Sequence, residues 1–380
     1  MKLQGKNEGL YKQEIFLIVI LWFLVSLPVF SKGGSGEGAS DAATITILTI
    51  NFFAVVTGFF AFMQMLGHVG IGALCTSLYV MSVYRFDRYM VERDIPELLC
   101  MAIFPVVFCE IYELVSRQRN NGRRLLTYVI FTGCVLLLAF LDIGFFEVTA
   151  ITVVILVIIT VAITKKWKIF LEVAVAFGVG GIAGGLFWIP KLQDLLSIPL
   201  IQERGLHFSG IFISFWKIKE KIPGTDADAM YTIPEGVGFL TLAGICILLV
   251  LWFLGHISFR EKQEEYIVGA AAVTAVLELF MTLKSFPWDR LQLANGITYR
   301  MVGVLKTPAI FLTPVIFISA LAWGYVIRRY ITKKEVLLCS FCTAIALIAV
   351  IVSGIYLTDV NNFYADYYEM MQMQNGIETK

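Results

Sequence analysis

The most chemically suggestive part of the chain is a short stretch of mixed charge, YRFDRYMVERDIPE at residues 84–97. Its charged side chains are Arg85, Asp87, Arg88, Glu92, Arg93, Asp94 and Glu97. Guanidinium groups match phosphate oxygens bidentately, and a neighbouring carboxylate can act as a base or hold a metal ion. The stretch therefore predicts a phosphate clamp of Arg85, Arg88 and Arg93, with Asp87 and Glu97 as catalytic carboxylates. The alternative is a solvated linker whose arginines extend from helix ends to the membrane surface.

Two later segments carry further candidates for substrate binding. SFPWDRLQ at 285–292 contributes Asp289 and Arg290, and LKTPAIFL at 305–312 contributes Lys306. An ionisable side chain at the start of an apolar helix is costly and is therefore a functional candidate. Lys306 lies close enough to the helix end that it can also simply reach the membrane surface.

Other polar residues have simpler interpretations. Asp142 and Glu147 flank a tight turn, where Asp142 is expected to cap the next helix. His68 and His207 are predicted on opposite sides of the membrane, so no metal site is expected. The glycine-rich GVGGIAGG at 178–185 lies inside an apolar block with no preceding strand. It predicts close helix packing and not a nucleotide loop, and no cofactor is expected beyond a divalent cation.

The elements that must position these residues are transmembrane helices. The chain of 380 residues is 58% hydrophobic and 16% charged, whereas soluble domains are about 45–50% apolar and about 25% charged. The seven cysteines lie in or beside apolar blocks, including Cys339 and Cys342, which are three positions apart on one helix face. A net charge of +1 gives no electrostatic case for a nucleic-acid partner.

The apolar residues form eleven blocks long enough to span a bilayer or nearly so. They cover about 15–30, 44–66, 68–84, 98–116, 125–141, 145–163, 169–190, 237–257, 266–283, 301–326 and 336–357. Only helices and closed barrels span lipid, and these blocks are too uniformly apolar for barrel strands. We therefore predict an all-α transmembrane domain over 1–357, with an outer loop at 191–236 and an outer C-terminal tail at 358–380.

Basic residues fix the expected orientation. With the N-terminus inside, the inner loops carry Lys2, Lys6, Lys12, Arg117, Arg119, Arg123, Arg124, Lys165, Lys166, Lys168, Arg260, Lys262, Arg328, Arg329, Lys333 and Lys334. Positive charge marks cytoplasmic loops. We predict a multi-pass protein of the bacterial plasma membrane, with the N-terminus inside and the C-terminus outside. The candidate site residues then lie on the outer face.

Several outer segments resemble a known family. Tyr84, Arg85, Asp87 and Glu97 match the spacing of a motif in the bacterial 6-pyruvoyl-tetrahydropterin synthase-related and YfhO-like membrane proteins, although Met90 and Glu92 replace an aromatic residue and an arginine. The FWIP, FPWD and LKTPAIFL segments resemble later motifs of that family, with Lys306 and Ile310 replacing glutamine and arginine. The likeness covers roughly residues 68–357. The family usually has a longer N-terminal region and a larger C-terminal one, so the chain is expected to be a short or partial member.

The family is similar to the C-type glycosyltransferases, which implies a membrane enzyme of cell-envelope glycan or lipid modification. The implied donor is a sugar on a polyprenyl phosphate, presented by the membrane lipid at the outer face. C-type transferases usually keep a catalytic carboxylate in the first outer loop, where this chain has Glu37 and Asp41 without the expected motif. Two alternatives therefore stay open, a transporter or flippase of a lipid-linked substrate and a non-catalytic accessory protein.

Overall fold

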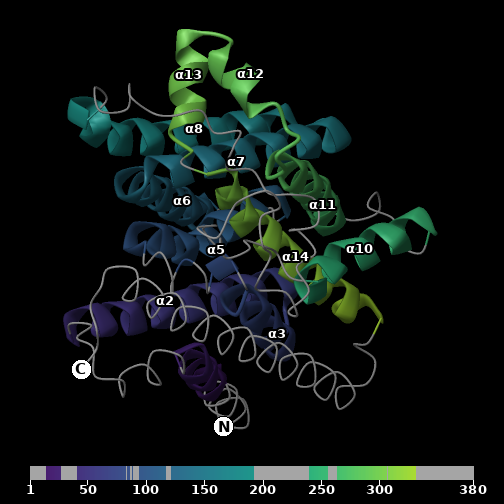
Figure 1. Cartoon of the computed structure of the whole chain (residues 1–380). Coiled ribbons are helices and arrows are strands. Elements are labelled where there is room, and N and C mark those ends of the chain that lie inside the picture. The colour runs from purple at the N-terminus through teal and green to yellow at the C-terminus, as the bar shows by residue number, and fades with distance from the viewer. Residues whose placement is uncertain are drawn as a thin grey trace, which may run out of the picture.

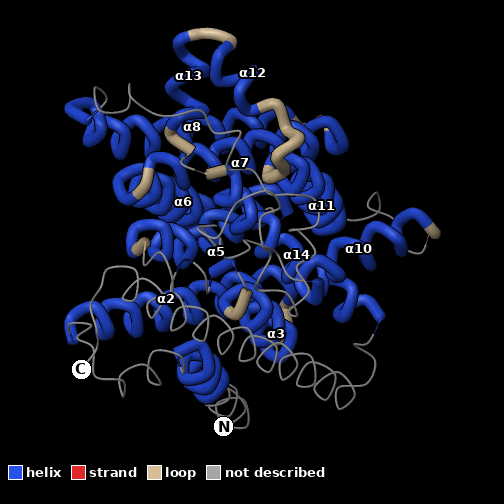
Figure 2. Tube along the Cα trace, viewed as in Figure 1, coloured by secondary structure: helices blue, strands red, loops and turns tan. Residues whose placement is uncertain are grey.

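The computed structural model describes residues 14–26, 41–82, 84–85, 88, 94–116, 121–191, 239–255, 263–305 and 307–330. Within these ranges the regular elements are helices, as the apolar blocks predicted (Figure 2). The first helix is Glu14–Ser26. The following elements are α2 (Asp41–Leu66), α3 (Val69–Val80), α5 (Ile95–Ser116), α6 (Asn121–Leu141), α7 (Ile143–Thr164), α8 (Trp167–Gly185), η2 (Leu186–Lys191), α10 (Phe239–Phe253), α11 (Gln263–Met281), α12 (Trp288–Leu293), α13 (Gly296–Gly303), η5 (Pro308–Phe311) and α14 (Leu312–Tyr330).

Six of the described helices are long and apolar enough to cross a membrane. Their candidate spans are Thr44–Leu66, Ile95–Val115, Arg124–Leu141, Ile143–Thr164, Trp167–Trp188 and Pro308–Arg329. The first helix, α3 and part of α10 are shorter apolar helices. Helix α11 is long enough, but it contains the three glutamates Glu264, Glu265 and Glu278. The expected block at 336–357 and the expected outer loop at 191–236 lie almost entirely outside the described residues, so eleven spans stays a prediction.

The sequence prediction of one helix over 301–326 is wrong in detail. The chain leaves α13 after Gly303, and Thr307 is extended, with φ −140° and ψ 145°. A residue before proline is pushed out of the helical region, and Pro308 follows at the start of η5. Helix α14 then begins at Leu312. The Thr307–Pro308 step therefore divides what composition alone shows as one apolar block.

Helices α14 and α5 form the centre of the bundle. In their candidate spans 89% and 78% of residues are buried, against 28% in those of α6 and α8. Figure 1 shows α14 running through the middle of the molecule. Phe317 of α14 is fully buried and stacks on Phe62 of α2 with ring centroids 4.7 Å apart. It also contacts Tyr79 of α3 and Phe104 of α5 edge-on, so one ring joins four helices.

The peripheral helices α6 and α8 lie side by side and run in the same direction. A Cβ added at Gly180 would lie 2.6 Å from the carbonyl oxygen of Thr132, and one at Gly184 would lie 2.6 Å from the Cβ of Ala139. Only glycine permits this approach at these two positions, which are four residues apart. The indole of Trp188 donates a 2.6 Å hydrogen bond to the Ala139 carbonyl at the end of the pair. The predicted packing role of the glycine-rich segment is confirmed.

The contacts also define two ends of the bundle. At the first, which we call the motif end, α3 ends, α5 and α7 begin, and residues 304–305 and 307–311 pack beside them. A Cβ at Gly144 would lie 2.6 Å from the Val304 carbonyl oxygen there. At the opposite end, which we call the basic end, α6, α8 and α11 begin and α14 finishes. Arg329 and Glu265 lie 3.0 Å apart at that end.

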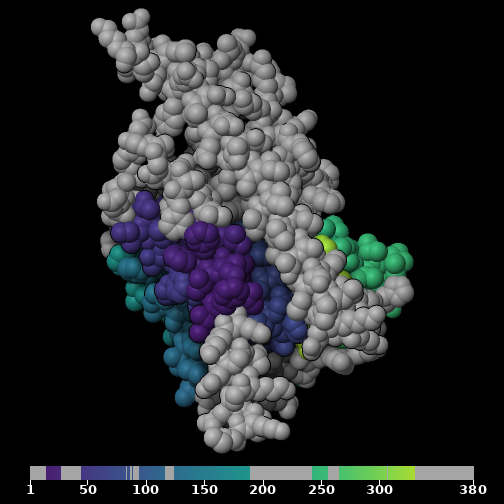
Figure 3. All heavy atoms as spheres, turned by 90° about the horizontal axis from the view of Figure 1, so that it is seen from below, coloured from purple at the N-terminus to yellow at the C-terminus, as the bar shows by residue number. Residues whose placement is uncertain are grey.

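The first helix lies against the outside of α2. The indole of Trp22 donates a 3.0 Å hydrogen bond to the Leu48 carbonyl, and its ring meets Phe52 edge-on at 6.1 Å. Seen from below, this helix is exposed on the surface beside α2 (Figure 3).

Candidate functional site

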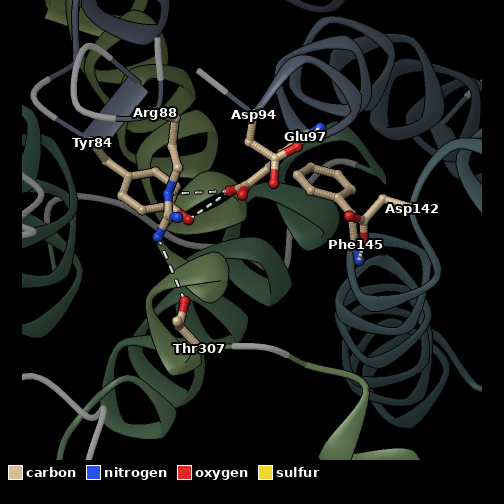
Figure 4. A network of polar contacts seen from close by, with 7 residues as sticks. All are labelled: Tyr84, Arg88, Asp94, Glu97, Asp142, Phe145 and Thr307. Carbon is tan, nitrogen blue, oxygen red and sulfur yellow. Dashed lines mark hydrogen bonds and ion pairs between the residues drawn. The ribbon is translucent and has the colours of Figure 1, made fainter. Parts of the chain in front are cut away.

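A buried group of three side chains at the motif end forms the core of the candidate site (Figure 4). The hydroxyl of Tyr84 donates a 2.7 Å hydrogen bond to Oε1 of Glu97. The Nε atom of Arg88 lies 3.5 Å from the same oxygen, and the Arg88 guanidinium lies over the Tyr84 ring, 4.9 Å from its centroid. Tyr84 is 0% exposed, and Arg88 and Glu97 are each 3% exposed. We refer to these three residues as the Tyr84–Arg88–Glu97 cluster.

Local sequence explains why Glu97 is held at this place. Helix α5 begins at Ile95, and Oδ1 of Asp94 accepts a 3.1 Å hydrogen bond from the backbone amide of Glu97. Asp94 therefore caps the helix, and Pro96 is tolerated because first-turn amides have no partner within the helix. Glu97 consequently sits in the first turn of α5, where the positive end of the helix dipole favours a carboxylate.

Arg85 anchors the other side of this region. Its guanidinium donates to the carbonyl of Val80 at 3.2 Å and to Oδ1 of Asn51 at 2.9 Å. Val80 is the last residue of α3, and a cation at a helix C-terminus is favoured by the helix dipole. The side chain is only 2% exposed overall. Arg85 thus ties the end of α3 to the interior of α2.

Arg88 also reaches the segment that divides α13 from α14. Its NH2 group lies 3.5 Å from the hydroxyl of Thr307, the residue before η5. Next to this contact, the Trp288 ring stacks on Phe311 of η5 with centroids 5.7 Å apart. The indole of Trp288 donates a 2.7 Å hydrogen bond to the Met281 carbonyl at the end of α11. The structure therefore brings the LKTPAIFL segment to Arg88, and Trp288 of the FPWD segment to LKTPAIFL.

The two charged residues of the FPWD segment have a different environment from Arg85 and Arg88. Arg290 is exposed and Asp289 is half-buried, both on the short helix α12. Helices α12 and α13 form a pair that projects from the bundle (Figure 1). Asn295 caps the second helix of the pair, accepting from the amides of Ile297 and Thr298 at 2.9 Å. The roles of Asp289 and Arg290 in substrate binding stay predictions.

The alternative of a solvated linker is wrong for the two described arginines of the 84–97 stretch, because both are almost completely buried. Asp87, Arg93 and Lys306 lie outside the described residues, as do Glu37 and His207. Asp142 is the predicted helix cap, and its Oδ1 accepts a 2.9 Å hydrogen bond from the Phe145 amide at the start of α7. His68 also caps a helix, with Nδ1 accepting from the Ile71 amide at 3.4 Å.

Two polar partners in this region were missed from the sequence. Asn51 lies ten residues into the apolar helix α2, and Thr307 precedes a proline in what was taken for a continuous helix. The available signal for Asn51 was a strongly polar side chain inside an apolar block, where it must find a partner. Thr307 had the Thr-Pro step itself as its signal.

The Tyr84–Arg88–Glu97 cluster can bind an anion through Arg88 or hold its own carboxylate, Glu97. The described residues contain no group of three or more His, Cys, Asp or Glu side chains that could hold a metal ion. No family model matches the chain, and no curated protein or solved structure matches it either. The resemblance to YfhO-like proteins and C-type glycosyltransferases therefore remains an expectation from the motifs.

Proposed function

We propose that the protein is a multi-pass membrane protein of the cell envelope that binds a polyprenyl-phosphate-linked sugar at the motif end of its bundle. In this proposal Arg85 and Arg88 hold the lipid phosphate. Glu97, the carboxylate that pairs with Arg88, would take a proton from the acceptor in a sugar transfer of the C-type glycosyltransferase kind. The observation that carries the proposal is the burial of two arginines and a glutamate together at one end of an apolar helical bundle.

Burial of these charges needs a reason because it is costly. Removing one ion from water costs several kcal/mol even after relaxation, and a close partner recovers only part of this. Ionisable side chains inside membrane bundles are therefore functional candidates by default. Arginine is the side chain best suited to a phosphate, since its planar donors match the phosphate oxygens.

The described pairing suggests how a ligand would enter. In the present arrangement Glu97 Oε1 occupies the side of Arg88 that a phosphate oxygen would take, at 3.5 Å from Nε. A phosphate would exchange with this carboxylate for the guanidinium, while Tyr84 stays as the hydrogen-bond donor to Glu97. Such an exchange frees a carboxylate beside the bound phosphate, where a base is needed.

The proposed orientation places the motif end outside and the basic end in the cytoplasm. Supporting this, basic side chains lie at the starts of α6 and α8 and in the last turn of α14, all at the basic end. Arg124 at the start of α6 pairs with Glu172 of α8 at 2.5 Å, and Lys168 lies 3.9 Å from the same carboxylate. Arg328 and Arg329 lie in the last turn of α14. Clustered positive charge is typical of cytoplasmic helix ends.

Ligand-induced stabilisation of purified protein tests the proposal. A ligand that binds only the native state at a hundred times its Kd stabilises it by about 2.7 kcal/mol. We expect undecaprenyl phosphate to raise the unfolding temperature of the wild type and of Arg328→Gln, an exposed charge at the basic end. The same lipid should have no effect on Arg88→Gln. Stabilisation by a nucleotide sugar and none by the lipid phosphate would overturn the proposal.

A second function is favoured by a specific observation, namely that Arg88 and Glu97 already satisfy one another. In a non-catalytic accessory protein the cluster would only join α5 to its neighbours. The double variant Arg88→Met/Glu97→Leu separates the two functions, because replacing a buried ion pair by apolar residues of similar volume is often close to neutral for stability. If the folded double variant still gains the full stabilisation from undecaprenyl phosphate, the cluster is structural and the accessory role is the better one.

A further inference from the structure

Glu278 is an ionisable side chain buried in the bundle away from the Tyr84–Arg88–Glu97 cluster. It lies on the inward face of α11, on the same helical stripe as Ile267, Ala271 and Thr274, each 0% exposed. Glu278 itself is 0% exposed. The opposite face of α11 exposes apolar residues such as Leu277 and Phe280. The glutamate therefore faces the packed interior, between α11 and α7.

The contact partner of Glu278 indicates its protonation state. The hydroxyl of Thr152 on α7 is within hydrogen-bond distance of Oε1 of Glu278 and lies 2.9 Å from the Val148 carbonyl. A hydroxyl has one proton and can donate only one of these two bonds. Buried threonines nearby donate to the carbonyl four residues earlier, as Thr149 does to Phe145 and Thr274 to Ala270, both at 2.9 Å. If Thr152 does the same, the proton of its second bond comes from Glu278.

The surroundings of Glu278 agree with a neutral acid. Among the described residues it forms no ion pair, and its Oε2 atom has no hydrogen-bond partner. A carboxylate buried without a counter-ion costs far more than the neutral acid, because charge and not polarity dominates the solvation penalty. A proton shared between Glu278 Oε1 and Thr152 Oγ1 removes this cost.

The ionisable groups of the neighbouring helices are engaged elsewhere or point away. On α7, Glu147 is only half-buried and lies five residues from Thr152, on another side of the helix. On α5, Glu113 accepts a 2.9 Å hydrogen bond from Gln64 near the basic end, and Glu110 is one turn earlier on the same helix. On α14, Arg329 pairs with Glu265 at the start of α11. Of these groups only Arg329 is a cation, and it is paired with Glu265.

We propose that Glu278 is a proton-binding site inside the bundle, which carries an exchangeable proton in the described state with Thr152 as its hydrogen-bond partner. In membrane pumps and transporters, buried carboxyls of this kind act as proton relays. The ligand class is a proton, delivered from one side of the membrane. The site is separate from the proposed phosphate site and stands whether or not that proposal holds.

Infrared spectroscopy of the purified full-length protein tests the proton directly. A protonated carboxyl in apolar surroundings gives a carbonyl band distinct from that of a carboxylate, and the band shifts when the acidic proton is replaced by deuterium. We expect such a band in the wild type, a shift in D2O, and loss of the band in Glu278→Gln. Thr152→Val should keep the band but move it, since the hydrogen bond is removed. A wild-type spectrum without the band, or a band unchanged in Glu278→Gln, overturns the proposal. A band that never shifts in D2O overturns it as well, because the proton is then not exchangeable.

Chemical labelling gives a second test that needs no variant to fold. A hydrophobic carbodiimide adds to a protonated carboxyl to form a stable acylurea, which peptide mass analysis locates. We expect labelling of Glu278 in membranes that decreases as the pH rises and is unaffected by sodium ions at constant pH. Protection of Glu278 from labelling by sodium at constant pH would show that the site binds a metal cation and not a proton, and would overturn the proposal. An unlabelled Glu278 alongside labelled Glu147 would have the same consequence, because Glu147 shows that the reagent is active.

Discussion

The contact between α6 and α8 gives the sharpest stability prediction, based on the substitution Gly180→Ala. The added Cβ would lie 2.6 Å from the Thr132 carbonyl oxygen and 3.0 Å from Cβ and Cγ1 of Val135. A carbon and a carbonyl oxygen normally approach no closer than about 3.3 Å, so the helices must separate by roughly 0.7 Å. The nearest atom belongs to the backbone and cannot rotate away.

Gly178→Ala is the matched control for this substitution. Both glycines lie within α8, two residues apart, but a Cβ at Gly178 would meet no atom within 4 Å. Alanine gains about 1 kcal/mol of helix propensity over glycine at either position, so this term cancels in the comparison. Overpacking a tight interface costs about 1–3 kcal/mol. We therefore expect Gly180→Ala to be about 1–3 kcal/mol less stable than Gly178→Ala.

Reversible unfolding in mixed detergent micelles, followed by the loss of helical signal, measures this difference. The loss should persist when Val135→Ala is added to Gly180→Ala, because the nearest atom is the Thr132 carbonyl oxygen, which belongs to the backbone. Equal stability of the two single variants would show that α6 and α8 are not packed through Gly180 and that the described register of the pair is wrong.

The remaining predictions concern orientation and the hairpin of α12 and α13. Reporter fusions after Lys168 should report the cytoplasm, and fusions after Asn295 should report the outside, because positive charge marks the cytoplasmic ends. A cytoplasmic signal at Asn295 would contradict the proposed orientation. Trp288→Ala should lower stability by about 3–5 kcal/mol, since Trp288 is 3% exposed and stacks on Phe311. Leu293→Ala, at a side chain that is 63% exposed, should change it by less than about 0.5 kcal/mol. Proteolysis of residues 284–305 should accelerate in the tryptophan variant alone, and equal cleavage of both variants would show that Trp288 does not anchor the hairpin.

The helices themselves were largely predictable because each depends on local composition. Apolar blocks of the right length, Asp142 as a cap, and the glycines of α8 all act over a few neighbouring residues. The expected helix starts at 44, 98 and 145 lie within three residues of the observed ones. The prediction of one helix over 301–326 was wrong because hydropathy does not register the helix break at the Thr307–Pro308 step.

The candidate site was predictable only in part, since a charged stretch indicates chemistry but not partners. The arginines and Glu97 were singled out by type and spacing. Burial of Arg88, however, depends on Thr307, which is 219 positions away in the chain. Likewise, Arg85 finds Asn51 across 34 positions. Such contacts arise only when separate helices pack side by side.

The sequence by itself determined that this protein is helical, with helices long and apolar enough to cross a membrane, and where most of them begin and end, because each apolar segment pairs its backbone internally. Only the tertiary structure decided which polar groups meet. It buried Arg88 with Glu97 beside Tyr84, where a solvated linker was the alternative, and it placed Glu278 of α11 against Thr152 of α7. The physical reason is that helix packing in lipid is set by small residues and side-chain shape. These leave a weaker pattern in the sequence than hydropathy does.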